Sequence, residues 1–458
     1  MDKLTRFVSD YVSYVARGSS KFYAWMACLG LLIVIWAYGN YVQATEGLAV
    51  TGLTDQVSDG LYLGNFVFLV GVAAAAVTVV FPAYVYRHKA LHEVTVLGEM
   101  VAVTAVIMCI LFIISHMGRP DRLWHMIPII GILNFPSSML AFDTLVLVGY
   151  LLLNLVGGFY FLYTKYTGSR MNHSWYLPLI YVSVVWALTI HTVTAFVINT
   201  MPARPHWNHT MMPIQFISTA FAAGPALIIL LFLIVRRNTK LAIADEAINL
   251  LSTIATYCLG IALFLIMSEV VTELYAMPEH ALGLEYLMFG AHGQGPLIPW
   301  FWGSLAAMIV AFVMLLIPGV RKNYRLLPTA CVLAFAGIWV QKGFGLLVPG
   351  YVPSPIGEVT NCVPTALEVL VTLGNWAIGF FILTILAKGA IGILLGEVKY
   401  VSDPWAVTRD AAPPYRTNVE PIRRQPWAPS SDPGARVEVG GGARRGSRAR
   451  RQGRVALG

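Results

Sequence analysis

The sequence has few charged residues. Only 12% of its 458 residues are Asp, Glu, Lys or Arg, whereas 57% are hydrophobic and the mean hydropathy is +0.68. A soluble domain usually carries about 25% charged residues, so a water-soluble enzyme of this size is excluded, because too few charges are present to cover its surface. The composition also excludes a disordered chain and a collagen-like repeat. The class that remains is a polytopic membrane protein.

Cysteine is also scarce, and no two of the five cysteines are close in sequence. The absence of a C-x-x-C pair or a ferredoxin-like run argues against a thiolate-held iron–sulfur cluster and against a disulfide framework. Haem of the b type needs two axial ligands inside a bundle, but only His191 lies well inside an apolar run, and His116 lies at the end of another. We therefore expect no bound haem or iron–sulfur cluster in this chain.

Ten apolar runs are long enough to cross a bilayer, which takes about 20 helical residues. They lie at about 22–43, 61–86, 95–116, 138–163, 174–199, 212–235, 248–275, 297–318, 325–343 and 364–388. Residues 1–21 are amphipathic and are expected to lie in the membrane interface. The first run is too long for a signal peptide and no cleavage site follows it. The sequence predicts an all-α protein with about ten transmembrane helices.

Lys and Arg are distributed unequally between alternate loops. The N-terminal segment and every second loop after it hold fourteen, whereas the other loops hold three. Because Lys and Arg accumulate in cytoplasmic loops, we expect a multi-pass protein of the cell inner membrane with both termini in the cytoplasm. The loops expected to face outward lie at about 44–60, 117–137, 200–211, 276–296 and 344–363.

The C-terminal segment differs from the rest. Residues 401–458 hold eleven arginines and five acidic residues and are rich in Pro and Gly, a composition typical of disorder. On a membrane protein such a tail more often contacts anionic lipid than nucleic acid. We expect three parts: the interfacial segment 1–21, a transmembrane domain at 22–400, and a disordered Arg-rich cytoplasmic tail at 401–458, with lipid but no nucleic acid as a partner.

Ionisable side chains occur inside the predicted spans, where they are costly and mark function by default. They are Glu99, Asp143, His191, Glu269, Glu273, Lys342 and Glu368. All except Glu99 fall toward the predicted outer side, and Glu269 and Glu273 share one helix face because they are four residues apart. Ion pairs with a purely structural role would not need to lie at the same depth in the membrane. Because these residues share one depth, they predict a functional site near the outer side.

Three of these residues have alternative interpretations. His191 is also compatible with a hydrogen bond between helices. Lys342 is compatible with snorkelling to the outer interface. Glu368 is compatible with an interfacial position if the last span begins later than we place it.

The strongest local pattern is the predicted outer segment 115–143. It contains, in order, His116, Arg119, Asp121, Arg122, Trp124 and His125. Arg side chains bind carbonyl oxygens and carboxylates in fixed geometry, and Asp121 is placed to orient either Arg. One interpretation is a substrate-binding lip over a pocket, with Asp143 just below it. The other is an outer loop held by local salt bridges.

Four segments resemble a known family. They are M-G-R-P-D-R-L-W-H-M-I-P (117–128), N-F-P-S-S-M-L-A-F-D (134–143), W-V-Q-K-G-F-G-L-L-V-P-G-Y-V-P-S-P-I-G-E (339–358) and P-T-A-L-E-V-L-V-T-L-G (364–374). They are similar to the NrfD-type, or polysulfide-reductase-type, integral membrane subunits. The branch they resemble most is the DsrP/HmeB-like one, found in electron-transfer complexes associated with sulfite reduction. The resemblance covers about 20–400, with Phe142 where that family has Trp.

The resemblance implies a fold and a function. It implies two four-helix bundles with flanking spans, and electron exchange with a membrane quinone or quinol that binds as an exchangeable substrate near the outer side. It further implies a ferredoxin-like iron–sulfur partner on the periplasmic face, cytochromes among the other subunits, and a link to sulfur metabolism. An ion-coupled secondary transporter and a passive anchor for the redox partner remain alternatives.

Roles for the candidate residues follow from quinol chemistry, which needs hydrogen-bond partners that gain and lose protons. We expect His116 or His191 to bind one quinone oxygen and Asp143 to carry the proton. Glu269 and Glu273 are further candidates, and Glu99, with Tyr150 and Asn154, would continue a proton path inward. Arg119 and Arg122 are expected to stabilise an anionic semiquinone or to dock the partner.

Overall fold

The transmembrane part of the chain is built from helices. The computed structural model describes residues 3–127, 129–276, 278–354, 357–359 and 362–401. Ten helical segments in this part are long and apolar enough to cross a membrane, which confirms the predicted all-α class with about ten spans. The predicted Arg-rich tail, from residue 402 on, lies outside the described residues.

The spanning segments lie close to the predicted runs. They are α2 (Ser20–Glu46), α3 and α4 (Leu61–Ala74 and Val77–Tyr84), α6 (Thr95–His116), α7 (Met139–Thr167), α8 (His173–Asn199), α9 (Met212–Asn238), α10 (Asp245–Val271) with the π-helical η3 (Thr272–Ala276), α12 (Ile298–Leu316), α14 (Leu327–Lys342) with α15 (Phe344–Leu347) and η4 (Val348–Tyr351), and α16 (Ala366–Leu394). The shorter elements are α1 (Lys3–Ala16), η1 (Leu48–Val50), α5 (Lys89–His92), η2 (Pro120–Met126), α11 (Pro278–Met288) and α13 (Pro318–Arg321).

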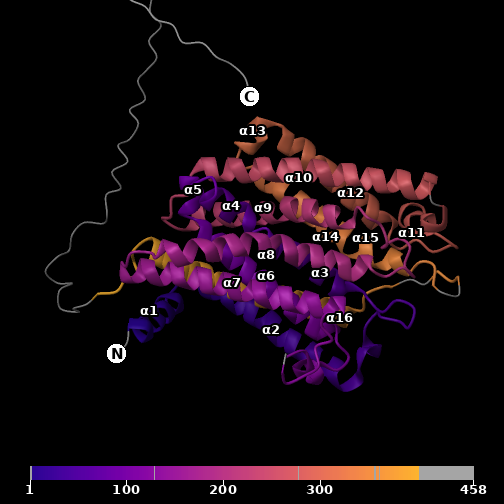
Figure 1. Cartoon of the computed structure of the whole chain (residues 1–458), viewed down its shortest axis with the longest axis horizontal. Helices are drawn as coiled ribbons and strands as arrows, with labels where there is room; N and C mark the ends of the chain where they lie inside the picture. The colour runs from indigo at the N-terminus through magenta and orange to yellow at the C-terminus, as the bar shows by residue number, and fades with distance from the viewer. Residues whose placement is uncertain (1–2, 128, 277, 355–356, 360–361, 402–458) are drawn as a thin grey trace, which may run out of the picture. The chain divides into compact units, whose positions relative to one another are not determined.

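Eight of the spans pack as two four-helix bundles. In the first, α3 and α7 each pack against both α6 and α8; in the second, α10 and α14 each pack against both α9 and α12. The bundles meet where α9 lies against α3 and α8, and where α14 reaches α3 (Figure 1). The remaining spans, α2 and α16, pack against each other, and α16 also packs against α6. This arrangement agrees with the two bundles and flanking spans that the family resemblance implies.

Helix α3 lies at the centre of these contacts. Every residue of α3 except Leu63 is buried, as expected for a helix that is apolar on all sides. Small residues allow its neighbours to approach closely. A Cβ on Gly71 would lie 3.2 Å from Cε1 of His191, and one on Gly224 of α9 would overlap Cβ of Ala75. The junction between the two bundles is therefore narrow, and His191 of α8 lies directly against α3.

The amphipathic N-terminal helix α1 packs on the helices rather than standing apart from them. Phe7 is buried and makes edge contacts with the rings of Phe159, Tyr163 and Tyr166 of α7. The hydroxyl of Tyr11 donates to the carbonyl of Leu386 in α16 at 3.0 Å. The aromatic face of α1 thus covers the end of α7 and α16.

The orientation predicted from the loop charges can be tested with single cysteines. Ile132, 83% exposed in a predicted outer loop, and Lys322, exposed in a predicted inner loop, would each be replaced by Cys in a Cys28→Ser background, because Cys28 is the exposed native thiol of the described part. We expect a membrane-impermeant maleimide added to intact spheroplasts to label Ile132→Cys and to leave Lys322→Cys unlabelled until the membrane is opened. Labelling of both variants from the same side would contradict the orientation.

Candidate functional site

Asp143 lies in the second turn of α7 and is buried, with 1% of its surface exposed. Its Oδ1 is 2.5 Å from the hydroxyl of Thr194 in α8, and that hydroxyl is also 3.0 Å from the carbonyl of Ile190. The threonine has one hydroxyl proton and cannot donate to both oxygens at once. When it donates to Ile190, Asp143 has to supply the proton of the Asp–Thr contact. The pair is thus suited to hold a proton and to give it up.

His191 lies one turn before Thr194 on the same face of α8. Its Nε2 is 3.0 Å from Nζ of Lys342 in α14 and also contacts the carbonyl of Phe216 in α9. The Lys342 ammonium donates to that carbonyl at 3.2 Å and lies 4.0 Å from the centre of the Phe216 ring. Nδ1 of His191 has no hydrogen-bond partner among the described residues.

Lys342 is buried in this contact, with 3% of its surface exposed. The interpretation that it snorkels to the outer interface is therefore wrong, because its amine lies against an aromatic ring and a carbonyl inside the junction. Two positive charges 3.0 Å apart in a buried site repel strongly, so the His191–Lys342 pair favours a single positive charge.

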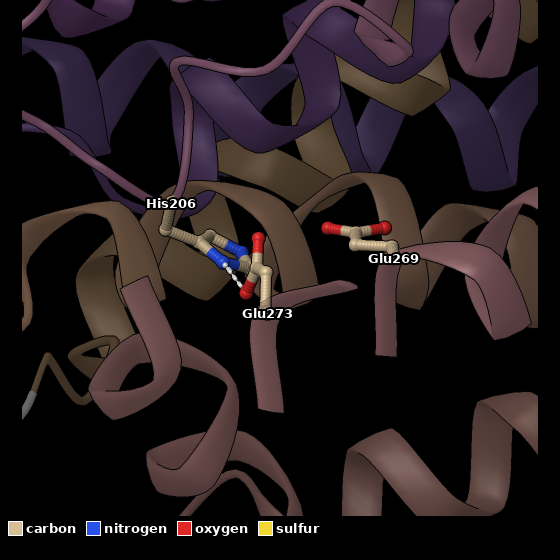
Figure 2. Close-up of side chains that lie close together, drawn as sticks. All are labelled: His206, Glu269 and Glu273. Atoms are coloured by element: carbon tan, nitrogen blue, oxygen red, sulfur yellow. Dashed lines mark hydrogen bonds and ion pairs between the residues drawn. The ribbon is translucent and has the colours of Figure 1, made fainter. Parts of the chain in front are cut away.

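A second group of ionisable side chains lies nearby, at the end of α10. Nδ1 of His206, from the loop between α8 and α9, is 3.2 Å from Oε2 of Glu273 in η3. Glu269, one turn earlier, accepts from Nε2 of Gln215 at 2.9 Å. Figure 2 shows its carboxylate on the same side of the helix as the His206–Glu273 pair. We name His206, Glu269 and Glu273 the His206 cluster.

Burial and charge act in opposite directions on His206. Burial lowers the pKa of its imidazole, but the hydrogen bond and the charge of Glu273 outweigh burial and leave that pKa above its ordinary value. Sequence reasoning missed His206, because a histidine in a polar loop is expected to be solvated. Its burial is a product of tertiary packing: the neighbouring Trp207 is inserted into the core and donates to the carbonyl of Leu346 at 2.8 Å.

His116 belongs to a third group, on the predicted outer face. Its Nε2 lies 3.0 Å from Oδ1 of Asp59 in the loop before α3. The hydroxyl of Tyr351 donates to the other oxygen of Asp59 and lies 2.9 Å from the hydroxyl of Ser58. Burial raises the pKa of Asp59, but the hydrogen bonds from His116 and Tyr351 outweigh it and hold the pKa below its ordinary value. Asp59 was not among the residues predicted from the sequence.

The predicted lip in the outer loop makes its contacts locally. Nε and Nη2 of Arg119 each donate at 2.9 Å to one carboxylate oxygen of Asp121, and both side chains are exposed. The ring of Trp124, 48% exposed, stacks on His125 with centroids 3.8 Å apart. Arg122 is exposed as well. This geometry agrees with the interpretation of a loop held by its own salt bridge and leaves the aromatic and basic groups on its surface.

Glu368 makes structural contacts at the ends of two spans. It is fully buried in the first turn of α16. Its Oε2 accepts from the backbone N–H of Gly52 and its Oε1 from that of Leu61, both at 3.1 Å. Leu61 begins α3, whose N-cap Gly60 has no side chain to bond the free N–H groups. A carboxylate from another helix therefore caps α3, where negative charge is favoured.

Glu99 is isolated from these groups. It is buried in α6 toward the predicted cytoplasmic side, next to Gly158, where a Cβ would lie 3.1 Å from its Oε2. That oxygen has no hydrogen-bond partner in the described part of the chain. Asn154 donates to the carbonyl of Tyr150 at 2.8 Å and the Tyr150 hydroxyl to Ala73 at 3.3 Å, so both expected partners bond to backbone. The inward proton path stays a prediction.

Known proteins with similar sequences were found for most of the chain. Residues 49–354, more than half of the chain, match the family model described as "Polysulphide reductase, NrfD". A protein of Mesobacillus selenatarsenatis, named as one subunit of a selenate reductase, is 23% identical over 365 residues, which are 71% of this chain and 81% of that protein. A protein of Halobacterium salinarum, named as a putative membrane subunit of a dimethyl sulfoxide reductase, is 25% identical over 401 residues, 78% of this chain and 88% of that one.

Proposed function

The chain belongs to the NrfD family of polysulphide reductase membrane proteins, and on this premise we propose that it exchanges electrons between a membrane quinone or quinol and a partner subunit. Oxidation of a quinol releases two electrons and two protons. The protons need acceptors within the membrane subunit, whereas the electrons need a redox centre close to the bound quinol. The sequence carries no cluster-binding cysteine pattern, so we place that centre in the partner.

The observation that carries this proposal is a line of buried polar side chains across the junction of the two bundles. Asp143 of α7 contacts Thr194 of α8, His191 lies one turn away on that helix, and His191 contacts Lys342 of α14. All four side chains are buried. A passive anchor would not need a proton-holding carboxyl beside a buried imidazole and ammonium, since such groups are costly in a membrane protein and concentrate on substrate and proton pathways.

We assign roles along this line according to the chemistry of each group. His191, whose Nδ1 has no bond within the described residues, is the proposed hydrogen-bond partner of one quinone oxygen. Asp143 accepts the proton, with Thr194 as its relay. His116, held by Asp59, is the alternative partner for a quinone oxygen nearer the outer face.

Glu269 and Glu273 are the proposed route for proton release toward the outer side. Gln215, which donates to Glu269, directly precedes Phe216, whose carbonyl accepts from Lys342. Two neighbouring residues of α9, Gln215 and Phe216, therefore contact the His206 cluster and the polar line respectively.

The outer loop is better suited to a protein partner than to the quinone. Arg119, Asp121, Arg122 and Trp124 are exposed, and His125 stacks on Trp124. We propose that they dock a ferredoxin-like iron–sulfur subunit on the periplasmic face. The names of the two relatives describe subunits of selenate and dimethyl sulfoxide reductases, which supports a reductase complex of several subunits. The finer link to sulfite reduction and cytochromes remains a proposal that rests on the segments at 117–128, 134–143, 339–358 and 364–374.

Binding of a quinone analogue separates a quinone-reactive subunit from a passive anchor. We expect the purified chain, in detergent with added lipid, to bind a fluorescent hydroxyquinoline-N-oxide-type analogue at one saturable site, and His191→Phe to weaken that binding. Ser183→Ala, on the same helix, is the control, because among the described residues the Ser183 hydroxyl bonds only to Ile180 of its own helix. Absence of saturable binding to the folded chain would favour the passive anchor.

A further inference from the structure

We propose that His206, Glu269 and Glu273 form a binding site for a divalent transition-metal cation of the Zn²⁺ type. Each side chain offers one ligand atom, and these atoms lie within 4.8 Å of one another. Imidazole and carboxylate are ligands that Zn²⁺ accepts in tetrahedral sites. The three ligand atoms would be one nitrogen of a loop histidine and one oxygen from each of two glutamates at the end of a helix.

The spacing of the donors is close to what a tetrahedral ion requires. Zn–N and Zn–O distances of about 2.0–2.1 Å place neighbouring ligand atoms roughly 3.3 Å apart. Nδ1 of His206 and Oε2 of Glu273 are 3.2 Å apart. The ligand atom of Glu269 lies within 4.8 Å of the other two, so a shift of at most about 1.5 Å would bring it to the spacing of a tetrahedral ion. Because its Oε2 is held by Gln215, its Oε1 is the oxygen available to the ion, and Oε1 is 3.9 Å from Nε2 of His209, a candidate fourth ligand.

The electrostatics of the cluster also favour a cation. Two carboxylates lie one helical turn apart, and the side chains of His206, Glu269 and Glu273 are 3%, 12% and 5% exposed. Oε1 of Glu273 is buried and has no hydrogen-bond partner among the residues that the structure describes. A buried anionic group with an unpartnered oxygen is costly, and a divalent ion that binds both carboxylates would offset their negative charge.

The local backbone is built to bring these groups together. Glu273 lies in the π-helical turn η3 that ends α10, and π-turns are frequent at functional sites. Gly283 of α11 lies against His206, so close that a Cβ on it would be 3.2 Å from Cβ of His206. Trp207 is fixed in the core by Leu346. Contacts from η3, from α11 and from the core around Trp207 therefore hold the His206 imidazole in place, as expected for a metal ligand.

A metal ion at this site would also regulate turnover, and this part of the inference rests on the proposed function. If Glu269 and Glu273 release protons from quinol oxidation, a cation bound there occupies the same oxygens and blocks release. We expect micromolar Zn²⁺ to slow quinol oxidation by the assembled complex. Binding of the ion does not depend on that role, so the two are tested separately.

Binding is tested with Co²⁺, whose visible absorption reports its ligands. The purified full chain, stripped of metal with a chelator, is titrated with Co²⁺ and then with Zn²⁺ as competitor. We expect one tetrahedral-type site per chain that Zn²⁺ displaces. Glu273→Gln and His206→Gln should each weaken binding by more than about tenfold, since loss of even an outer-shell partner costs about 10–100-fold. Glu246→Gln, exposed on the same helix, should bind as the parent does.

Several outcomes would overturn the site. They are the absence of a stoichiometric site in the parent chain, an affinity of Glu273→Gln equal to that of Glu246→Gln, or an unchanged cobalt spectrum in His206→Gln. If the variants fail to fold, X-ray absorption of the Zn²⁺-loaded parent chain decides: nitrogen and oxygen ligands with an imidazole signature support the site, and sulfur ligands or no imidazole exclude it. Binding without inhibition of quinol oxidation would retain the metal site and remove Glu269 and Glu273 from the proposed proton route.

Discussion

Replacement of Asp143 by Asn is expected to slow quinol-dependent reduction of the partner's clusters by about 10²–10⁴-fold, the usual contribution of a general acid–base group. Asn keeps the size of the side chain and can still hydrogen-bond to Thr194, but it cannot bind and release a proton. The carboxyl is 1% exposed and contacts Thr194, whereas Arg119 is bonded to Asp121 in the loop. In the structure, Asp143 is therefore not the ion-pair partner of Arg119.

The measurement is turnover per assembled complex, so that loss of chemistry is distinguished from loss of protein. Thr194→Val is the graded comparison: it removes the proposed relay hydroxyl, which contacts Asp143 at 2.5 Å, but preserves volume and the carboxyl. We expect it to reduce turnover much less than Asp143→Asn, because the proton acceptor remains. Turnover near that of the parent in fully assembled Asp143→Asn would exclude Asp143 from the mechanism. The proton role would then pass to Glu269 and Glu273.

Glu368→Ala should give the opposite pattern: a chain that folds poorly, with normal turnover in whatever assembles. Its carboxylate accepts the N–H groups of Gly52 and Leu61 in a fully buried position. The buried Leu61 N–H left without an acceptor costs about 1–3 kcal/mol, and the half-buried Gly52 N–H adds a smaller amount. That loss is a large fraction of the stability of a typical protein.

The effect is read as the fraction of chain that stays monodisperse in detergent after a temperature ramp. Glu368→Gln is the graded comparison, because an amide offers one acceptor oxygen and turns a donor toward the second N–H. Glu358→Ala, at an exposed loop position, is the matched control and should melt as the parent does. If Glu368→Ala were as stable as Glu358→Ala but inactive, Glu368 would belong to the reaction rather than to the fold.

These two carboxylates show how similar sequence contexts lead to different roles. Both lie near the predicted outer end of an apolar run and both are buried. Asp143 contacts a hydroxyl that also has an alternative acceptor, which is why we propose it as the proton carrier. Glu368 accepts from two backbone N–H groups, so both of its oxygens are used to hold distant segments together. The difference depends on the partners, which come from segments far away in the chain.

The sequence alone determined the class and the span pattern of this protein, because a bilayer requires about 20 apolar residues per helix and that requirement is local. It likewise identified Asp143 and His191 as buried, since an ionisable residue within such a run has to be placed inside the protein. The family was also recognisable from short segments such as 117–128 and 134–143, and the match over 49–354 confirms it.

Only the tertiary structure decided which ionisable side chains contact one another. Lys342 lies against His191, 151 residues away, and Asp59 against Tyr351, 292 residues away. Hydropathy cannot specify such pairs, because it describes each helix separately and not which faces pack together. For the same reason His206 was missed: only the insertion of Trp207 beside it and the close approach of Gly283 bury a loop histidine next to Glu273.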